Sequence, residues 1–259
     1  MLISRKRQVI KNRRGDSIKK KLGILGGLGP FATNYFFELI LNMTKAKVEQ
    51  DHLEIIIYNK PSIPDRTGFI VGSSSANPIF DMIEAALALD KMSLDYIAIP
   101  CITAHYFYDE LQAHIKTPII HGVKETAIYL DNYGAKTVGI MATKGTISSN
   151  LLQRKLEEYG IKTVIPGLME QEYVNNIIYD NVKVNKPVDM DKFNLVADNL
   201  RNQGADIIIL GCSELSMIKK NYDIGDDFID TMEVLARRCI DLCHGNIKED
   251  YEFLIKKVI

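Results

Sequence analysis

The sequence lacks the apolar segments that would insert a protein into a membrane or direct its secretion. No stretch approaches the roughly 18 consecutive apolar residues of a transmembrane helix, so a membrane span is excluded. The opening residues, MLISRKRQVIKNRRGD, contain no apolar block of signal-peptide length, so we do not expect secretion. The chain has only four cysteines, and without secretion these are expected to be reduced thiols. These absences predict a soluble protein of the cytoplasm.

The rest of the composition is ordinary for a globular protein. Of the 259 residues, 46% are hydrophobic and 25% charged, enough for one large domain or two modest ones. Short apolar runs predict strands buried on both faces at 21–27, 53–59, 95–101, 136–143 and 205–212, with shorter candidates at 116–122 and 161–167. Amphipathic segments predict helices at 31–46, 78–92, 104–115, 122–132, 148–159, 171–183, 189–203 and 228–244. This alternation predicts an α/β fold with parallel sheets flanked by helices.

The first residues are strongly basic. Residues 1–21 contain nine Lys and Arg residues against one acid, Asp16. Such an arm can contact nucleic acid or another acidic surface. Because no aromatic residue accompanies these charges and the rest of the chain is acidic, we instead expect residues 1–20 to be a disordered leader, with no nucleic-acid partner.

Two pairs of short motifs indicate an internal duplication. Gly23-Ile24 recurs as Gly139-Ile140, 116 residues later, and the strand that ends at Cys101 recurs at Cys212, 111 residues later. We therefore expect two similar lobes related by a pseudo-twofold axis, the first built from 21–119 plus 226–259 and the second from 120–225. Ligands of open parallel sheets bind beyond the carboxyl ends of the strands, so both cysteines are expected in one cleft between the lobes.

The setting of these two cysteines favours a chemical role. Each follows a strand and precedes a turn with a hydroxyl residue, and Cys101 also precedes a predicted helix. A thiol at a helix N-terminus feels the positive end of the dipole, and the free backbone N–H groups beside it can hold a carboxylate. An unpaired cysteine is more often a small buried hydrophobe, but the matched pair favours function over packing. Cys239 and Cys243 lie four apart on an apolar helix face and are predicted to pack in the core.

Metal, redox and nucleotide alternatives are less well supported. Cys101, His105 and Cys212 are a conceivable zinc set, but no CxxC or HxxxH occurs and no fourth ligand is evident, so we expect no metal. A Cys101–Cys212 disulfide is a further alternative, although neither thiol has a CxxC partner.

GILGGLGP at 23–30 does not complete a dinucleotide motif, since Ala32 stands where the third glycine belongs and no acidic residue follows the second strand. The turn is better suited to presenting amides to a small anion.

Other candidates for binding an anion follow strand ends. Arg66, in PDRT, can form a bidentate pair with a carboxylate. Thr143 and Thr146, in ATKGT, follow the strand that contains Gly139-Ile140. In the duplication this strand corresponds to the one that contains Gly23-Ile24 and precedes the glycine-rich turn. Lys183 is a lone cation after an amphipathic helix.

Taken together, these motifs resemble the cofactor-independent aspartate/glutamate racemase family, specifically its aspartate racemase branch. The similarity runs from about Lys21 to Cys243, leaving out the basic leader. Glu214 favours the aspartate branch, because the glutamate branch typically has Thr-His after its second cysteine. The matching segments are GILGGLGPFAT (23–33), IPDRT (63–67), PCITAHYFY (100–108), MATKGT (141–146) and GCSEL (211–215).

The resemblance implies racemisation of an acidic amino acid by two bases, without pyridoxal phosphate or metal. One cysteine, as thiolate, removes the α-proton and the other, as thiol, protonates the opposite face. The family is often homodimeric. The resemblance assigns Arg66 and Lys183 to the side-chain carboxylate and Glu214 to the amino group, with Thr103, Ser213, Thr143 and Thr146 as further substrate-binding candidates.

Two residues depart from the family pattern. Ile102 stands where the family usually has an Asn that contacts substrate, and Leu28 stands where many relatives have Met. If Ile102 faces the substrate, it removes a polar partner and weakens action on aspartate. The alternatives are therefore a decarboxylation or cis-diacid isomerisation on the same scaffold, or a non-catalytic carboxylate-binding regulatory protein.

Overall fold

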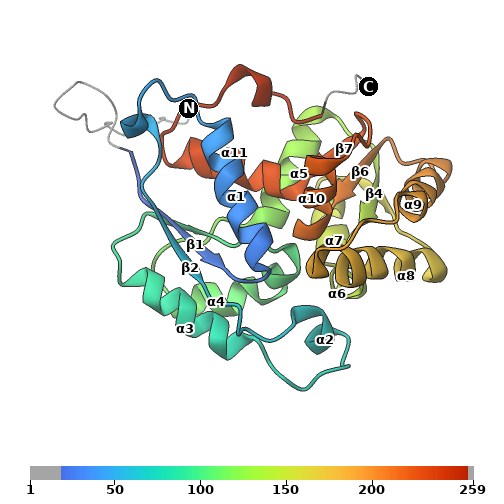
Figure 1. Cartoon of the computed structure of the whole chain (residues 1–259), viewed down its shortest axis with the longest axis horizontal. Helices are drawn as coiled ribbons and strands as arrows, with labels where there is room; N and C mark the ends of the chain where they lie inside the picture. Colours follow the sequence, from blue (N-terminus) through green and yellow to red (C-terminus); the bar gives the residue numbers. More distant parts are fainter. Residues whose placement is uncertain (1–18, 256–259) are drawn as a thin grey trace, which may run out of the picture.

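The computed structural model describes residues 19–255, so most of the predicted leader (residues 1–18) lies outside the described part of the chain. Seven strands form two separate parallel sheets within this part, with helices on both faces of each (Figure 1). The strand order is β2-β1-β3 in the first sheet and β5-β4-β6-β7 in the second. The predicted fold class, α/β with two parallel sheets flanked by helices, is confirmed.

The first sheet and its helices occupy the N-terminal part of the chain. Its elements are β1 (Leu22–Gly26), α1 (Pro30–Met43), η1 (Glu49–Asp51), β2 (Ile55–Asn59), α2 (Arg66–Ile70), α3 (Ile79–Asp90), β3 (Tyr96–Ala98), η2 (Ile102–Phe107) and α4 (Tyr108–His114). The elements that follow are α5 (Gly122–Tyr133), β4 (Thr137–Met141), α6 (Lys144–Ser148), α7 (Leu151–Glu157), β5 (Lys162–Val164), α8 (Leu168–Asn176), η3 (Ile177–Asn181), η4 (Val182–Val184), α9 (Met190–Asn202), β6 (Ile207–Leu210), α10 (Ser213–Asn221), β7 (Phe228–Asp230), α11 (Thr231–Leu242) and η5 (Glu249–Tyr251).

The hydrophobic core has three parts, and the central one joins the sheets. Leu22 and Ile24 of β1 point into the same apolar cluster as Ile207 and Ile209 of β6. Helices α1, α5 and α11 supply much of the rest of this central core, and Figure 1 shows α1 and α11 crossing in the middle of the molecule. The alternate strand residues pack outward, against α3 and α4 on the first sheet and against α8 and α9 on the second. Because the central core is shared, neither lobe buries its apolar surface alone.

The repeated Gly-Ile dipeptides have the same physical role in both sheets. Ile24 and Ile140 are fully buried in the central core. Gly23 and Gly139 point the opposite way, toward a closely packed element of the outer layer. A Cβ on Gly23 would lie 2.5 Å from Leu94 Cδ1, and one on Gly139 would lie 3.0 Å from the Cβ of Leu200. The glycines let the outer elements approach the central strand of each sheet.

Some predicted elements differ from the structure. β2 was expected to be buried on both faces, but it is an edge strand on which Ile57 is 38% exposed. The first residues of the predicted helix 228–244 form β7 instead. At 116–122 there is only an isolated bridge, Ile97 to Ile119. Three helices that carry site residues, α2, α6 and α10, were not predicted, because all three are short and begin inside the motifs rather than in amphipathic runs.

The predicted lobe boundary after residue 225 also needs correction at one strand. Phe228–Asp230 was assigned to the first lobe, yet it pairs with β6 in the second sheet. The side of β6 away from β4 offers unpaired backbone groups, and β7 satisfies them before α11 enters the central core. Within residues 19–255, no helix is long and apolar enough to cross a membrane.

We expect Gly139→Ala to lower the free energy of unfolding by about 1–3 kcal/mol, because the added Cβ overpacks a rigid part of the core. Urea denaturation measures the effect. Gly167→Ala is the matched control, since a Cβ there meets only the carboxyl end of Glu170 within 4 Å. Equal losses in the two variants would contradict the close approach of α9 to β4.

Candidate active site

The two candidate cysteines occupy equivalent positions in the two sheets. Cys101 is the N-cap of η2 and Cys212 the N-cap of α10, each just beyond the carboxyl end of a strand. Their backbone angles are similar, with φ −147° and ψ 106° at Cys101 and φ −145° and ψ 137° at Cys212. Both are almost fully buried, at 7% and 5% exposure. Cys239 and Cys243, in contrast, lie in the central core as predicted.

Both thiols line one narrow space between the lobes, which we call the inner gap. Its volume is about 10 Å³. A single water molecule needs roughly 10–15 Å³, so the gap as it stands is too small for an amino acid. The predicted residues that line it are Leu28, Arg66, Cys101, Thr103, Thr143, Lys183, Cys212 and Glu214. The lining residues that sequence reasoning missed are Asp65, Thr67 and Tyr179.

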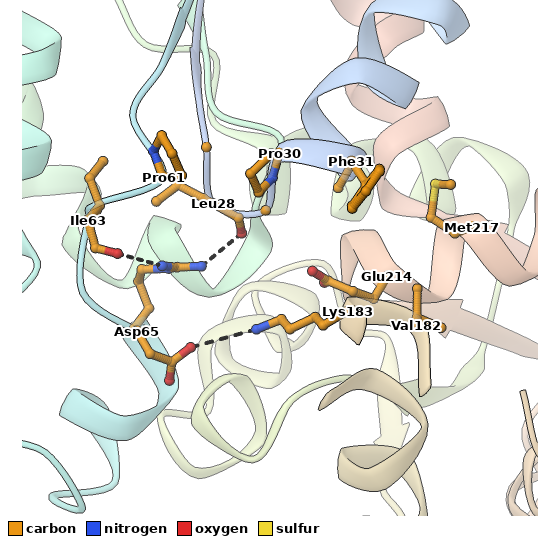
Figure 2. A pocket seen from close by; sticks show the side chains of 14 residues that line it. Leu28, Pro30, Phe31, Pro61, Ile63, Asp65, Val182, Lys183, Glu214 and Met217 are labelled. Atoms are coloured by element: carbon orange, nitrogen blue, oxygen red, sulfur yellow. Dashed lines mark hydrogen bonds and ion pairs between the residues drawn. The ribbon is translucent and has the colours of Figure 1, made fainter. Parts of the chain in front are cut away.

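A larger space, the outer cavity, adjoins the inner gap. It measures about 250 Å³ and shares Leu28, Asp65, Arg66, Lys183 and Glu214 with the gap. Apolar side chains line much of the rest, and Figure 2 shows them grouped around the charged residues. The apolar lining residues are Leu28, Pro30, Phe31, Ala32, Pro61, Ile63, Val182 and Met217.

Arg66 is a buried cation beside Cys101. Its Nη2 donates to the Leu28 carbonyl at 2.8 Å and its Nη1 to the Pro64 carbonyl at 3.0 Å, while Nε has no partner. Burial by itself would lower the pKa of Arg66, but Cys101, Asp65 and Glu214 together raise it above its ordinary value. The guanidinium therefore stays charged beside Cys101.

Cys212 has the opposite kind of neighbour. Its Sγ–H donates to Glu214 Oε2 at 3.0 Å, and the Ser213 hydroxyl donates to the same oxygen at 3.1 Å. Burial, then the charge and hydrogen bond of Glu214, raise the pKa of the Cys212 thiol well above its ordinary value. Glu214, expected at the substrate amino group, contacts the thiol instead. Ser213 does not line the inner gap itself but orients the carboxylate that does.

Lys183 is joined to Asp65 across the gap. Its Nζ lies 3.7 Å from Asp65 Oδ1 and 3.8 Å from the centroid of the Tyr179 ring, and the ion pair is drawn in Figure 2. The Tyr179 hydroxyl donates to the same Asp65 oxygen at 3.2 Å. Burial, as the main cause, raises the pKa of Tyr179. Tyr179 lies on a short π-helical segment, a departure from helical periodicity that the sequence does not signal.

Three buried hydroxyls form a closed triangle where the lobes meet. Thr103 Oγ1 lies 3.0 Å from Thr143 Oγ1 and 2.9 Å from Thr146 Oγ1, and the latter two are 3.1 Å apart. Thr103 and Thr143 line the inner gap, whereas Thr146 lies behind them and supports them. The triangle thus links η2 of the first lobe to α6 of the second.

Ile102 does not face the inner gap or the outer cavity, contrary to the prediction. It is 4% exposed and belongs to the central core, and its Cδ1 would lie 3.5 Å from a Cβ on Gly122. The tight 3-10 turn after Cys101 directs this side chain toward α5 rather than toward the cleft. Its apolar character is therefore explained by packing.

His105 is buried behind Cys101. Its Nε2 lies 3.3 Å from the Ile99 carbonyl, which also accepts the Cys101 N–H at 2.8 Å. Its ring stacks on His121 with centroids 5.3 Å apart. Burial, then the neighbouring His121, lower the pKa of His105 to about 3. Among the described residues, no group of three or more His, Cys, Asp or Glu side chains is arranged to hold a metal ion.

Comparison with known proteins points to one family. A model described as Asp/Glu/Hydantoin racemase matches residues 25–239. The chain is 28% identical over 226 residues to the broad specificity amino-acid racemase RacX of Bacillus subtilis (strain 168), covering 85% of this chain and 96% of that relative. Among solved structures, Picrophilus torridus aspartate racemase has a TM-score of 0.79 at 33% identity, covering 90% of this chain and 97% of that one. An aspartate racemase homologue from Pyrococcus horikoshii OT3 has a TM-score of 0.71 at 27% identity, covering 87% of this chain and 99% of that one.

We expect Ile102→Asn to destabilise the fold by about 1–3 kcal/mol, because Ile102 lies in the central core and the amide would be buried there without a partner. Urea denaturation measures this loss. Leu168→Asn, at the 93% exposed first position of α8, is the control, with an expected change below about 0.5 kcal/mol. An Ile102→Asn protein of unchanged stability would place this side chain in the cleft after all.

His105 should make the fold sensitive to acid. Its pKa is about 3 in the folded protein and roughly 6.5 when unfolded, so between these values only the unfolded chain binds the proton. Stability is therefore lost as pH falls from about 6.5 toward 3, by up to roughly 1.4 kcal/mol per pH unit. We expect urea denaturation of His105→Asn from pH 7 to 4 to show a shallower loss. His114→Asn, at an exposed position, controls for removing a histidine, and parallel curves for His105→Asn and the wild type would contradict the assignment.

Proposed function

The chain belongs to the Asp/Glu/Hydantoin racemase family and is an amino-acid racemase, and on that premise we propose that it inverts an acidic amino acid, aspartate or glutamate, by a two-cysteine mechanism. The family resemblance inferred from the motifs is confirmed by the match over residues 25–239. The observation that carries the mechanism is that Cys101 and Cys212 line the same gap from equivalent strand ends of two sheets. Inversion of a carbon requires an acid and a base on opposite sides, and this arrangement provides one thiol from each lobe.

The two thiols start in different protonation states. Cys101, beside the Arg66 guanidinium, is the thiolate that takes the α-proton from one enantiomer. Cys212, hydrogen-bonded to Glu214, is the thiol that gives its proton to the opposite face of the same carbon. In the reverse direction the roles exchange. The first transfer breaks the C–H bond of the substrate and forms an S–H bond on Cys101. The second transfer breaks the S–H bond of Cys212 and forms a C–H bond on the opposite face.

The negative charge that develops at the α-carbon spreads into the α-carboxylate and needs donors that are already in place. The backbone N–H groups that follow Cys101 and Cys212 at the starts of η2 and α10 support this role. The Thr103 and Thr143 hydroxyls lie at the same gap. We assign the side-chain carboxylate of the substrate to Arg66 and Lys183.

Substrate binding requires the inner gap to widen. Lys183 is paired with Asp65 while the gap is closed. A substrate carboxylate arriving through the outer cavity carries the same charge as Asp65 and replaces it as the partner of Lys183. Exchange of one carboxylate for another keeps Lys183 paired as the lobes move apart.

A second candidate substrate class is an amino acid with an uncharged, apolar side chain. The apolar lining of the outer cavity favours it, because such a side chain gains from leaving water there. The name of the Bacillus subtilis relative, a broad specificity amino-acid racemase, points the same way.

The test is proton exchange at the α-carbon in heavy water. L- and D-aspartate, glutamate, leucine and methionine are each incubated with the protein, and deuterium incorporation and optical rotation are followed. Exchange with loss of rotation supports a racemase, and the rates rank the two substrate classes. Binding without exchange indicates a carboxylate-binding protein, whereas loss of carboxyl carbon from a malonate indicates a decarboxylase.

We also propose that the protein works as a homodimer, as the family resemblance implies. Strand β2, an exposed edge that carries Ile57 and Tyr58, supports this, because unpaired edges favour association. Light scattering that gives the mass of a single chain at assay concentration would refute it.

We expect Cys101→Ala and Cys212→Ala each to lower racemisation by at least about 100-fold with the fold intact, because each removes one of the two proton-transfer groups. Each variant should still exchange the α-proton of one enantiomer without inverting it. Cys243→Ala, a cysteine of the central core, is the control and should change stability but not turnover. Racemisation near the wild-type rate in either of the first two variants would exclude the two-base mechanism.

A further inference from the structure

Glu214 joins the inner gap to the outer cavity. It is 5% exposed, contacts the Cys212 thiol at 3.0 Å and lines both spaces. Four other residues line both, but none of them has a hydrogen bond to Cys212 in the described part of the chain. Asp65, the other carboxylate among them, is held by Lys183 and Tyr179.

We infer that, after each turnover, Glu214 transfers a proton from the outer cavity to the Cys212 thiolate. The inference rests on the proposed two-cysteine mechanism. It gives Glu214 a role in returning the free enzyme to its starting state, rather than in binding the substrate amino group.

A two-base racemase needs such a step. After one inversion Cys101 holds the proton taken from the substrate, and Cys212 has lost the one it gave. The next molecule of the same enantiomer cannot react until both thiols have returned to their starting states. Cys101, beside the Arg66 guanidinium, releases its proton to water, and this proton neutralises the hydroxide that forms when Cys212 is reprotonated.

The geometry supplies the proton for the other thiol. A Cys212 thiolate would stand 3.0 Å from the Glu214 carboxylate, and two like charges this close favour uptake of one proton. Water in the outer cavity donates that proton to Glu214, forming an O–H bond and leaving hydroxide to the solvent. The Glu214 O–H bond then breaks, an S–H bond forms on Cys212, and the carboxylate returns. Ser213, Lys183 and Arg66 are the polar groups around this carboxylate, and the Ser213 hydroxyl fixes the oxygen that faces the thiol.

Steady-state kinetics of Glu214→Gln test the inference. The amide keeps the size of the side chain but cannot carry the proton, so return of the free enzyme should limit turnover at high substrate. We expect kcat to fall at least about tenfold while kcat/KM stays within about threefold. Equal losses in kcat and kcat/KM would assign Glu214 to substrate binding or to the chemical step, and no change in either would remove it from the reaction. Both results overturn the inference.

Chemical rescue provides a second measurement. Glu214→Ala opens space beside Cys212 that formate can reach through the outer cavity, and formate should restore part of the lost kcat. Circular dichroism checks that the variant is folded, and failure of formate to restore kcat in the folded protein overturns the inference. Glu38→Gln is the matched control, since Glu38 pairs with Lys220 of α10 away from both thiols.

A titration without substrate separates this inference from the proposed function. In a Cys101→Ala/Cys239→Ala/Cys243→Ala background, Cys212 is the one cysteine left, so thiolate absorbance reports it. Adding Glu214→Gln should lower the midpoint of Cys212 by about one pH unit or more, because the opposing charge is gone. An unshifted midpoint overturns the inference whatever the activity. A shifted midpoint in a protein that racemises no amino acid supports the coupling of Glu214 to Cys212 and overturns the proposed function instead.

Discussion

The apolar contact between the two sheets is the constraint on which the rest of this structure depends. Each sheet packs one face against α1, α5 and α11, so the inner faces of both lobes share a single core. This shared burial fixes the carboxyl ends of both sheets around the same gap. Cys101 and Cys212 therefore line one gap from the two lobes. Ile102 and Cys243, which resemble functional residues by type or position, serve this core.

Backbone symmetry and chemical asymmetry are combined in the site. Cys101 and Cys212 have nearly the same N-cap geometry, which follows from the repeated strand-turn-helix unit. Their neighbours differ in charge: a guanidinium lies beside one and a carboxylate beside the other. In a buried site these charges act at short range and with little screening. Similar backbones thus hold one thiol beside a positive charge and one whose pKa is raised by burial and by Glu214.

Each charged group of the site has a hydrogen-bond or ion-pair partner while the gap is closed. Lys183 pairs with Asp65, Arg66 donates to carbonyls, and Glu214 accepts from the Cys212 thiol and Ser213. These contacts offset the cost of burying charge in a space of about 10 Å³. An amino acid brings its own carboxylate and ammonium groups, so binding can replace internal contacts rather than create unpaired charges. The closed gap and the wider cavity beside it fit a cycle of opening, exchange and closure.

The sequence by itself determined the parts of this protein that depend on local pattern. Apolar runs predicted the strands of both sheets except β7, the Gly-Ile and Cys motifs revealed the repeat, and the motif set identified the family. These signals are short in range, because strand burial, turn chemistry and helix starts involve neighbouring residues. Only the tertiary structure decided what depends on contacts between distant segments. It placed Ile102 in the core, added β7 to the second sheet, brought Asp65 to Tyr179 and Lys183, and turned Glu214 toward a thiol. A side chain's direction at a helix start is set by the packing of elements far apart in the chain, and no local pattern contains that packing.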